Sequence, residues 1–168
     1  FGVIGNPISH SLSPNIHRLW IKHFNLQASY DAILVEDLEA FFLSAKNTLA
    51  GFNVTVPFKE QVLAFCDELS PEVSALGAAN TIVNENGRWK AYNTDGLGFM
   101  RSVEEQLSLS VINKEILVFG AGGSAKAVIA SLIKNNVKRI YICNRTQKNA
   151  VSIKDVYSET FSNIECVS

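Results

Sequence analysis

The sequence has no excess of charge of either sign and no long apolar run. Its 15 basic and 16 acidic residues give a formal net charge of −1, which offers no basic footprint for nucleic acid. No apolar run approaches the roughly 18–20 residues that span a bilayer. The first residues carry no basic region and are not expected to be a secretory signal. We therefore expect neither nucleic acid nor a membrane as a partner.

Cysteine and histidine are too scarce and too scattered to predict a metal site. Cys66, Cys143 and Cys166 are odd in number and show no ligand pairing. Thiols in this pattern are expected to stay reduced, which favours a cytoplasmic protein. Apolar residues, by contrast, are plentiful: 47% of the chain is hydrophobic and 18% is charged. This composition predicts a folded chain of one ordinary domain or two small ones.

The most informative stretch is Gly51–Lys59. Apolar and polar residues alternate from Phe52 to Val56, which is the period of a half-buried strand. Pro57 ends the strand and suits the first position of a helix predicted over residues 60–65. Lys59 would then face the positive end of the helix dipole, so it is either solvated or kept for its chemistry. Ligands bind at such strand ends in open α/β sheets.

Two serines follow a short strand predicted over residues 1–5. Ser13 precedes Pro14 at the start of an amphipathic helix and would serve as its N-cap. Ser11 has no such structural role in the sequence pattern. A pair of hydroxyls beyond a strand end could hold a carboxylate or a polyhydroxy ligand. Capping and ligand binding both stay open for Ser13.

Strands and helices alternate through the first part of the chain, which predicts a mainly parallel sheet. A strand is expected at 30–35 and a helix at 36–47, and a β-hairpin is expected at 78–92 around an Asn-Gly turn. Asp95 or Thr94 would cap a helix that runs to about residue 107, although either residue could instead have a functional role. We place the domain change there, with domains at 1–107 and 108–168.

The second domain opens on a fingerprint for dinucleotides. An apolar strand at 115–120 is followed by Gly120-Ala121-Gly122-Gly123-Ser124-Ala125 and a helix, and a second strand is expected at 139–143. The motif has the form G-x-G-x-x-A within a strand–turn–helix unit. Its glycines permit a tight turn and let a pyrophosphate approach the N–H groups of the helix N-terminus.

The residues after the second strand predict which dinucleotide binds. An NAD site usually has an acidic residue there for the ribose 2′-hydroxyl, but this chain has Asn144-Arg145-Thr146. Arg145 can pair with a 2′-phosphate through a charge-assisted fork, which favours NADP. The alternative is that Arg145 is a solvated residue at the start of a helix.

Taken together, these motifs resemble the shikimate dehydrogenase family. The motifs that carry the resemblance, in order, are Gly5-Asn6-Pro7-Ile8, His10-Ser11-x-Ser13-Pro14, Asn53-Val54-Thr55-x-Pro57-x-Lys59, Ala79-Asn80-Thr81, Asn93-Thr94-Asp95-Gly96, Gly120-Ala121-Gly122-Gly123 and Asn144-Arg145-Thr146. The resemblance implies an α/β fold, with an N-terminal, mainly parallel substrate domain followed by a partial Rossmann-type NADP-binding domain. It also implies that the second half of that domain lies beyond this chain.

The resemblance further implies an activity: the reversible, NADPH-dependent reduction of 3-dehydroshikimate to shikimate, in the synthesis of chorismate and aromatic amino acids. Lys59 and Asp95 would form the catalytic pair. Ser11 and Ser13 would bind the substrate carboxylate, while Thr55, Asn80 and Asp95 would hold ring hydroxyls. The residues that would bind the NADP cofactor are Gly120, Ala121, Gly122, Gly123, Ser124, Ala125, Asn144, Arg145, Thr146 and Lys148.

Two other functions remain possible at this stage. One is a quinate/shikimate dehydrogenase that uses NAD, against which Arg145 and the missing acidic residue count. The other is a non-catalytic module that only binds a small molecule, against which the presence of both Lys59 and Asp95 counts. A monomer and a homodimer are both compatible with the sequence.

Overall fold

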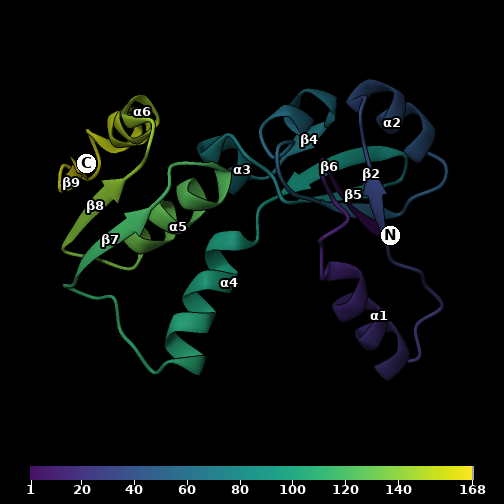
Figure 1. Cartoon of the computed structure of the whole chain (residues 1–168), viewed down its shortest axis with the longest axis horizontal. Coiled ribbons are helices and arrows are strands. Elements are labelled where there is room, and N and C mark those ends of the chain that lie inside the picture. Colours follow the sequence, from purple (N-terminus) through teal and green to yellow (C-terminus); the bar gives the residue numbers. More distant parts are fainter. Residues whose placement is uncertain (168) are drawn as a thin grey trace. The chain divides into compact units, whose positions relative to one another are not determined.

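The computed structural model describes residues 1–167, which divide into two compact units (Figure 1). The first unit runs from Phe1 to Asn93, and the second begins at Thr94. Each unit has its own sheet and its own buried core. The α/β class predicted from the alternation of strands and helices is confirmed.

The first unit is built on a six-stranded sheet with the strand order β2-β1-β3-β5-β6-β4. The strands are β1 (Gly2–Gly5), β2 (Asp31–Leu34), β3 (Gly51–Val54), β4 (Glu68–Leu69), β5 (Thr81–Glu85) and β6 (Arg88–Tyr92). Strand β1 runs parallel to both β2 and β3, and β4 runs parallel to β6, whereas β5 is antiparallel to its two neighbours. The carboxyl ends of β1 and β3 therefore lie side by side at one edge of the sheet.

The hairpin predicted around the Asn-Gly turn is confirmed. Strands β5 and β6 pair so that Glu85 lies opposite Arg88. The two residues between them, Asn86 and Gly87, have φ values of 54° and 81°. Positive φ at both positions is the requirement of a type I′ turn, and Asn-Gly meets it at little steric cost.

Aromatic side chains form much of the core of the first unit. The helical segments of this unit are α1 (Ser13–His23), α2 (Leu38–Ala45), η1 (Gln61–Phe65) and α3 (Pro71–Leu76). Phe42 of α2 meets Phe52 of β3 and Trp89 of β6, with ring centroids 5.5 and 5.9 Å apart, and Phe52 and Trp89 meet each other at 5.3 Å. These three rings are almost fully buried, so they join α2 to two separate strands of the sheet.

Helix α1 differs from the others because much of its apolar face is exposed. Leu19, Trp20 and Phe24 are each more than half exposed. The helix contacts the unit through Ile21, which packs against a small cluster around Val3, and through Arg18 and His17, which contact Tyr30. The amphipathic pattern therefore predicted the helix, but the position of its apolar side chains could not be read from that pattern.

The segment after β3 does not continue as the helix that the sequence predicts. Residues 56–60 form turns, and η1, a 3-10 helix, begins only at Gln61 with Glu60 in the N-cap position. Lys59 thus precedes the helix and does not lie in its first turn, so the expectation that it opposes a helix dipole is wrong. Phe58 explains the turn, because its side chain is buried in the core and its carbonyl accepts from the N–H of Val62.

The second unit is a βαβαβ arrangement on a parallel sheet with the order β7-β8-β9. Its elements are α4 (Asp95–Arg101), the π-helical η2 (Ser102–Gln106), β7 (Glu115–Phe119), α5 (Gly123–Lys134), β8 (Arg139–Cys143), α6 (Gln147–Tyr157) and β9 (Ile164–Val167). Aliphatic side chains fill its core, among them Ile129, Leu132, Ile140 and Ile142, which are fully buried. The strand–turn–helix unit around the glycine motif is confirmed.

The division between the two compact units falls before α4, whereas the sequence analysis places the change of domain between residues 107 and 108. Helix α4 belongs to the second unit because it packs closely on α5. A side chain at Gly96 would lie only 2.6 Å from the Ala127 carbonyl oxygen of α5, so a residue without a Cβ is needed at this crossing. Asp95, the first residue of α4, is therefore carried by the second unit.

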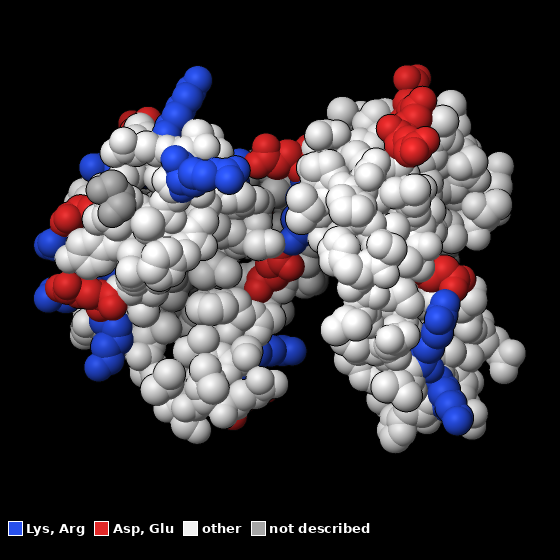
Figure 2. Space-filling view, in the orientation of Figure 1, with Lys and Arg blue, Asp and Glu red and all other residues white. Residues whose placement is uncertain are grey.

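Charges of both signs are distributed over the surface. On the face drawn in Figure 2, basic and acidic side chains are interspersed and most of the surface carries neither. In the second unit, exposed ion pairs join neighbouring strands, Lys138 with Glu115 and Arg139 with Glu165, each at 2.8 Å. Within residues 1–167 no helix is long and apolar enough to cross a membrane.

Candidate active site and dinucleotide site

Ser11 and Ser13 lie between the end of β1 and the first turn of α1, and both are half-buried. Ser13 is already the first residue of α1, and the N-cap position belongs to Leu12, whose side chain makes no capping bond. The predicted N-cap role of Ser13 is therefore wrong. The Ser11 hydroxyl oxygen instead accepts a hydrogen bond from the Ser13 N–H at 3.3 Å. Ser11, and not Ser13, therefore accepts a hydrogen bond from the backbone at the start of the helix. The reason is that α1 begins at Ser13, one residue before the proline that was expected at its first position.

Backbone hydrogen bonds hold the segment with Thr55 and Lys59 at the carboxyl end of β3. The Thr55 N–H donates to the carbonyl of Ile4 in β1 at 3.0 Å. The Lys59 carbonyl accepts from the N–H of Ala79 at 2.8 Å. Both Thr55 and Lys59 are half-buried. The segment is therefore fixed between the end of β1 and the chain that enters β5.

Asn80 is oriented by a chain of side-chain hydrogen bonds. The Thr81 hydroxyl donates to Asn80 Oδ1 at 2.9 Å and accepts from Asn53 Nδ2 at 3.2 Å. Asn53 Oδ1 in turn accepts from the Tyr30 hydroxyl at 2.6 Å. Burial raises the pKa of Tyr30 to about 12, so that hydroxyl stays protonated and remains a donor. Because the Asn80 amide oxygen accepts from Thr81, this hydrogen bond fixes the orientation of the Asn80 side chain.

The motif residues of the first unit are thus linked through the sheet. The carbonyl of Asn80 accepts from the Val54 N–H at 2.8 Å, one residue before Thr55. Thr55, Lys59 and Asn80 therefore lie on adjoining segments at one end of β3 and β5. The motifs predicted these residues, but the supporting roles of Tyr30 and Thr81 could not be read from the sequence, because they depend on contacts between distant segments.

Asp95 contacts the glycine motif of its own unit. The Ser124 hydroxyl donates to Asp95 Oδ2 at 3.2 Å. Asp95 is half-buried at the first position of α4, and Thr94 occupies the N-cap position without a side-chain capping bond. The N-cap position is therefore not that of Asp95, and the Thr94 side chain does not cap the helix, so neither residue is the side-chain N-cap that one alternative from the sequence predicts.

The glycine motif forms an open turn between β7 and α5. Gly120 has a φ of 112°, and its N–H donates to the Cys143 carbonyl at the end of β8, at 2.8 Å. A Cβ at Gly120 or Gly122 would meet nothing within 4 Å, so the space beside both glycines is open to another molecule. The N-terminus of the 12-residue helix α5 opens onto this turn. Such a turn fits a dinucleotide pyrophosphate, which needs close approach to backbone N–H groups.

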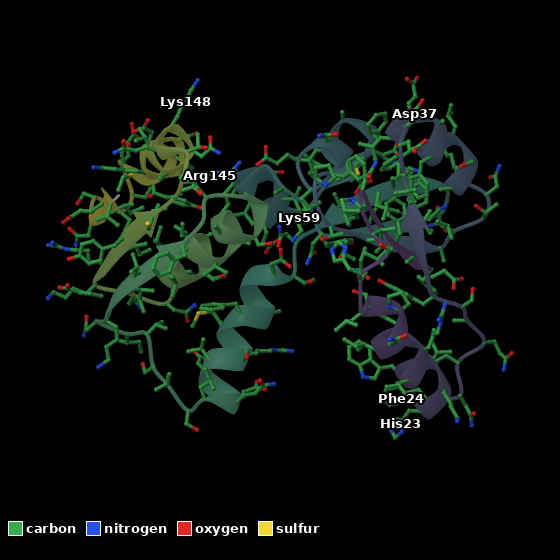
Figure 3. The ribbon with its side chains drawn as sticks, viewed as in Figure 1. His23, Phe24, Asp37, Lys59, Arg145 and Lys148 are labelled. Atoms are coloured by element: carbon green, nitrogen blue, oxygen red, sulfur yellow. The ribbon has the colours of Figure 1, made fainter. Side chains whose placement is uncertain are left out.

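Arg145 and Lys148 are exposed near the start of α6, where both side chains can be followed in Figure 3. Asn144 fixes this loop, since its side-chain amide donates to the Thr146 carbonyl at 2.8 Å. The loop follows β8, the strand beside the glycine turn. No acidic residue occurs from Asn144 to Lys148, so the two cations face no neighbouring carboxylate in the sequence that would repel a phosphate.

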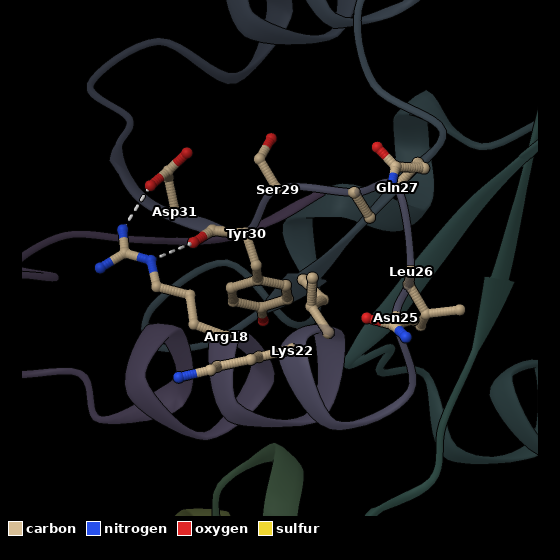
Figure 4. Close-up of a pocket in the computed structure, with 10 residues that line it drawn as sticks. Arg18, Lys22, Asn25, Leu26, Gln27, Ser29, Tyr30 and Asp31 are labelled. Carbon is tan, nitrogen blue, oxygen red and sulfur yellow. Dashed lines mark hydrogen bonds and ion pairs between the residues drawn. The ribbon is translucent and has the colours of Figure 1, made fainter.

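Two hollows in the first unit are lined by none of the predicted site residues. One, of about 340 Å³, lies between α1 and the segment before β2, where Arg18 bridges the Asp31 carboxylate and the Tyr30 carbonyl (Figure 4). The other, of about 440 Å³, is an apolar groove lined by side chains such as Trp20 and Phe24. Among residues 1–167, no group of three or more His, Cys, Asp or Glu side chains could hold a metal ion.

Two family models match this chain, and together they span most of it. The model described as the shikimate dehydrogenase substrate binding domain matches residues 3–82, and the model described as shikimate / quinate 5-dehydrogenase matches residues 102–167. The chain belongs to the shikimate dehydrogenase family. This membership bears out the resemblance seen in the motifs.

Individual relatives agree with the family models. A curated relative from Caldicellulosiruptor saccharolyticus, named shikimate dehydrogenase (NADP(+)), is 41% identical over 162 residues, which cover 94% of this chain and 58% of the relative. The structure of shikimate dehydrogenase from Aquifex aeolicus is 38% identical with a TM-score of 0.90, and the match covers 99% of this chain and 61% of that one. The chain therefore spans about three fifths of the length of these relatives.

A further solved structure carries ligands. It is the shikimate 5-dehydrogenase of Thermus thermophilus in complex with NADP(H) and shikimate, which is 31% identical to this chain with a TM-score of 0.89. The match covers 100% of this chain and 62% of that one. The similarity confirms the α/β architecture with a substrate-binding domain followed by part of a Rossmann-type domain.

Proposed function

We propose that the protein is an NADP-dependent shikimate dehydrogenase, which reversibly reduces 3-dehydroshikimate to shikimate in the synthesis of chorismate and aromatic amino acids. The observation that carries the proposal is the division of the motifs between the two units. The first unit holds Thr55, Lys59 and Asn80 on segments joined by hydrogen bonds. The second unit holds an open glycine turn and an exposed arginine after β8. Both belong to one enzyme family.

Lys59 and Asp95 are the proposed catalytic pair. NADPH supplies the hydride when it is bound. As the substrate carbonyl is reduced, negative charge develops on its oxygen, and the Lys59 ammonium is the group proposed to stabilise that charge and donate the proton. Asp95 would accept a hydrogen bond from a ring hydroxyl and balance the charge of the lysine.

Four further residues of the first unit would position the substrate. We propose that the Ser11 and Ser13 hydroxyls bind the substrate carboxylate, and that Thr55 and Asn80 bind ring hydroxyls. The hydrogen bond from Thr81 supports this role for Asn80, because it holds the Asn80 side chain in one orientation. Hydroxyls and amides at fixed positions suit a ligand that carries several hydroxyls.

The proposed NADP site lies along the glycine turn and the loop after β8. Its pyrophosphate would approach the segment of Gly120, Ala121, Gly122, Gly123, Ser124 and Ala125. Asn144, Arg145, Thr146 and Lys148 would surround the adenosine ribose, with Arg145 and Lys148 contacting its 2′-phosphate. The open space beside Gly120 and Gly122 supports this placement. We also propose that residues 1–107 serve the substrate and residues 108–168 the dinucleotide, with Asp95 acting on the substrate from helix α4, which packs with the second unit.

The proposed setting is a cytoplasmic enzyme that acts as a monomer or a homodimer on a small-molecule substrate. The cysteines of residues 1–167 are free, which suits a reducing compartment. Neither nucleic acid nor a membrane is proposed as a partner, in keeping with the net charge of −1.

The direct test is to follow NADPH absorbance in the protein produced from its complete gene. We expect oxidation of NADPH when 3-dehydroshikimate is added, reduction of NADP⁺ when shikimate is added, and much weaker activity with NADH at equal concentration. Efficient use of quinate with NAD would instead indicate a quinate/shikimate dehydrogenase. Binding of shikimate without turnover in either direction would refute the catalytic proposal and indicate a binding protein.

A further inference from the structure

Ser124 stands at a position that the dinucleotide fingerprint leaves free. The motif requires small residues at Gly120, Gly122 and Ala125, whereas the position of Ser124 is one of its variable ones. The Ser124 hydroxyl nevertheless has a specific partner, since it donates to Asp95 Oδ2 at 3.2 Å. The hydrogen bond thus connects the turn proposed for NADP with the acid proposed for the substrate.

The crossing of α4 and α5 brings these two residues together. A Cβ at Gly96 would clash with the hydroxyl oxygen of Ser131 as well as with the carbonyl oxygen of Ala127. Ser124, Ala127 and Ser131 are spaced at i, i+3 and i+7 on α5, so they share one face of the helix. This face receives the start of α4, which places Asp95 over the first turn of α5.

We propose that Ser124 is a positioning residue, which fixes the carboxylate of Asp95 for the substrate and so couples the dinucleotide turn to the substrate site. The proposal rests on the proposed function of Asp95. A carboxylate at the first position of a helix can adopt several orientations. A hydroxyl that donates to one of its oxygens selects among them, and hydrogen bonds to a charged acceptor are stronger than those between neutral groups. The hydrogen bond would thus hold the carboxylate in one orientation.

The test compares three variants in the protein produced from its complete gene. Ser124→Ala removes the hydroxyl, and Ser124→Thr retains it. Ser131→Ala removes a hydroxyl from the same helix face, but seven residues away from the contact with Asp95. For each variant, kcat and KM for 3-dehydroshikimate and the Kd of NADPH are measured, the latter by fluorescence titration.

We expect Ser124→Ala to lower kcat/KM for 3-dehydroshikimate about 10-fold, which is the usual size of one hydrogen bond to a charged group. The Kd of NADPH should stay within about twofold, since the turn binds pyrophosphate through backbone groups. Ser124→Thr should restore most of the loss, and Ser131→Ala should behave as the wild type. Unchanged kcat/KM in Ser124→Ala would overturn the proposal. A weakened affinity for NADPH with unchanged turnover at saturation would also overturn it, because the Ser124 hydroxyl would then bind the cofactor and not position Asp95.

A double-mutant cycle with Asp95→Asn separates this inference from the proposed function. If Ser124 acts through Asp95, adding Ser124→Ala to Asp95→Asn should have no further effect on kcat/KM. A full additional loss in the double variant would contradict the positioning role. If Asp95→Asn alone left kcat/KM unchanged, the proposed role of Asp95 would be wrong and the inference would fall with it. A strong effect of Asp95→Asn with none of Ser124→Ala would reject the positioning role alone.

Discussion

The two compact units hold their candidate site residues in different ways. In the first unit, side chains orient other side chains, as in the chain from Tyr30 through Asn53 and Thr81 to Asn80. In the second unit, the glycine turn offers backbone groups and open space, and the loop after β8 adds exposed cations. A side-chain substitution in the first unit should therefore disturb substrate recognition, whereas one in the glycine turn should leave NADPH binding nearly unchanged.

The cores of the two units also differ. The first unit relies on aromatic rings from α2, β3 and β6. The second unit packs aliphatic side chains of α5, β8, α6 and β9. The comparison indicates that aromatic packing stabilises the first unit and aliphatic packing the second.

The largest effect is expected from the aromatic core. Phe52 is 3% exposed and meets Phe41, Phe42 and Trp89 with centroids 5.1–5.5 Å away. Phe52→Ala should lower the free energy of unfolding by about 3–5 kcal/mol, through lost transfer energy and the cavity left behind. Denaturant unfolding measures this change. The control is Phe119→Ala in the second unit, whose side chain is 78% exposed and which should change stability by less than about 0.5 kcal/mol.

The next effect concerns the cation after β8. Arg145→Ala should weaken NADPH binding by roughly 10- to 100-fold, because a charge-assisted contact to the 2′-phosphate contributes about 1.5–3 kcal/mol. NADH, which lacks that phosphate, should bind equally to both proteins. Fluorescence titration of both nucleotides gives the ratio. The control is Lys154→Ala on helix α6, which follows Arg145. An equal loss of affinity for NADPH and NADH in Arg145→Ala would show that Arg145 does not contact the 2′-phosphate.

A smaller effect is expected in the hydrogen-bond chain of the first unit. Thr81→Val keeps the shape of the side chain but removes the hydroxyl that holds Asn80 and Asn53. One such bond contributes about 1 kcal/mol, so KM for 3-dehydroshikimate should rise roughly 5-fold while the Kd of NADPH stays constant. The matched control is Thr160→Val in the second unit, because the Thr160 hydroxyl donates to the backbone carbonyl of Tyr157. A change in NADPH affinity in Thr81→Val would contradict the proposal that the two units bind substrate and nucleotide separately.

The smallest effect is a pH dependence confined to the first unit. All three histidines lie there, and His17 stacks on Tyr30 with centroids 3.9 Å apart. Burial lowers the pKa of His17 below its ordinary value of 6.5. The unfolded chain therefore binds the proton more readily, so the stability of this unit should fall as the pH drops through about 6.5 and rise again above it. Hydrogen exchange resolved by unit would measure this. Loss of the pH dependence in His17→Gln is expected, and an equal change in both units would contradict the assignment.

Much of the second unit was predictable because its signals are local. The glycine motif, the strand before it and the helix after it are adjacent in the sequence, and the structure has them as expected. In the first unit the strand at β3 and the hairpin were predictable for the same reason. The start of α1 was not predictable. The turn around Lys59 was not predictable either, because the burial of Phe58 decides it, and strand β4 was not, because its pairing with β6 decides it. Gly96 gave no local signal either, since its role depends on α5.

The candidate site was predictable as a set of residue types but not as an arrangement. The motifs named Lys59, Asn80 and Asp95. They did not show that Thr81 links Asn80 to Asn53 or that Ser124 contacts Asp95, because these links join separate segments. Nor could the pattern place Asp95 on the second unit, since a helix gives no sign in the sequence of which core it joins.

The most direct measurement is the turnover and the NADPH affinity of Lys59→Ala in the protein produced from its complete gene. If Lys59 of the first unit supplies the proton and the second unit binds the nucleotide, kcat should fall by about 10²–10⁴, the usual contribution of a general acid. The Kd of NADPH should remain within about twofold of the wild type, since the glycine turn and Arg145 are untouched. Near-normal turnover, or loss of NADPH binding together with turnover, would contradict the account.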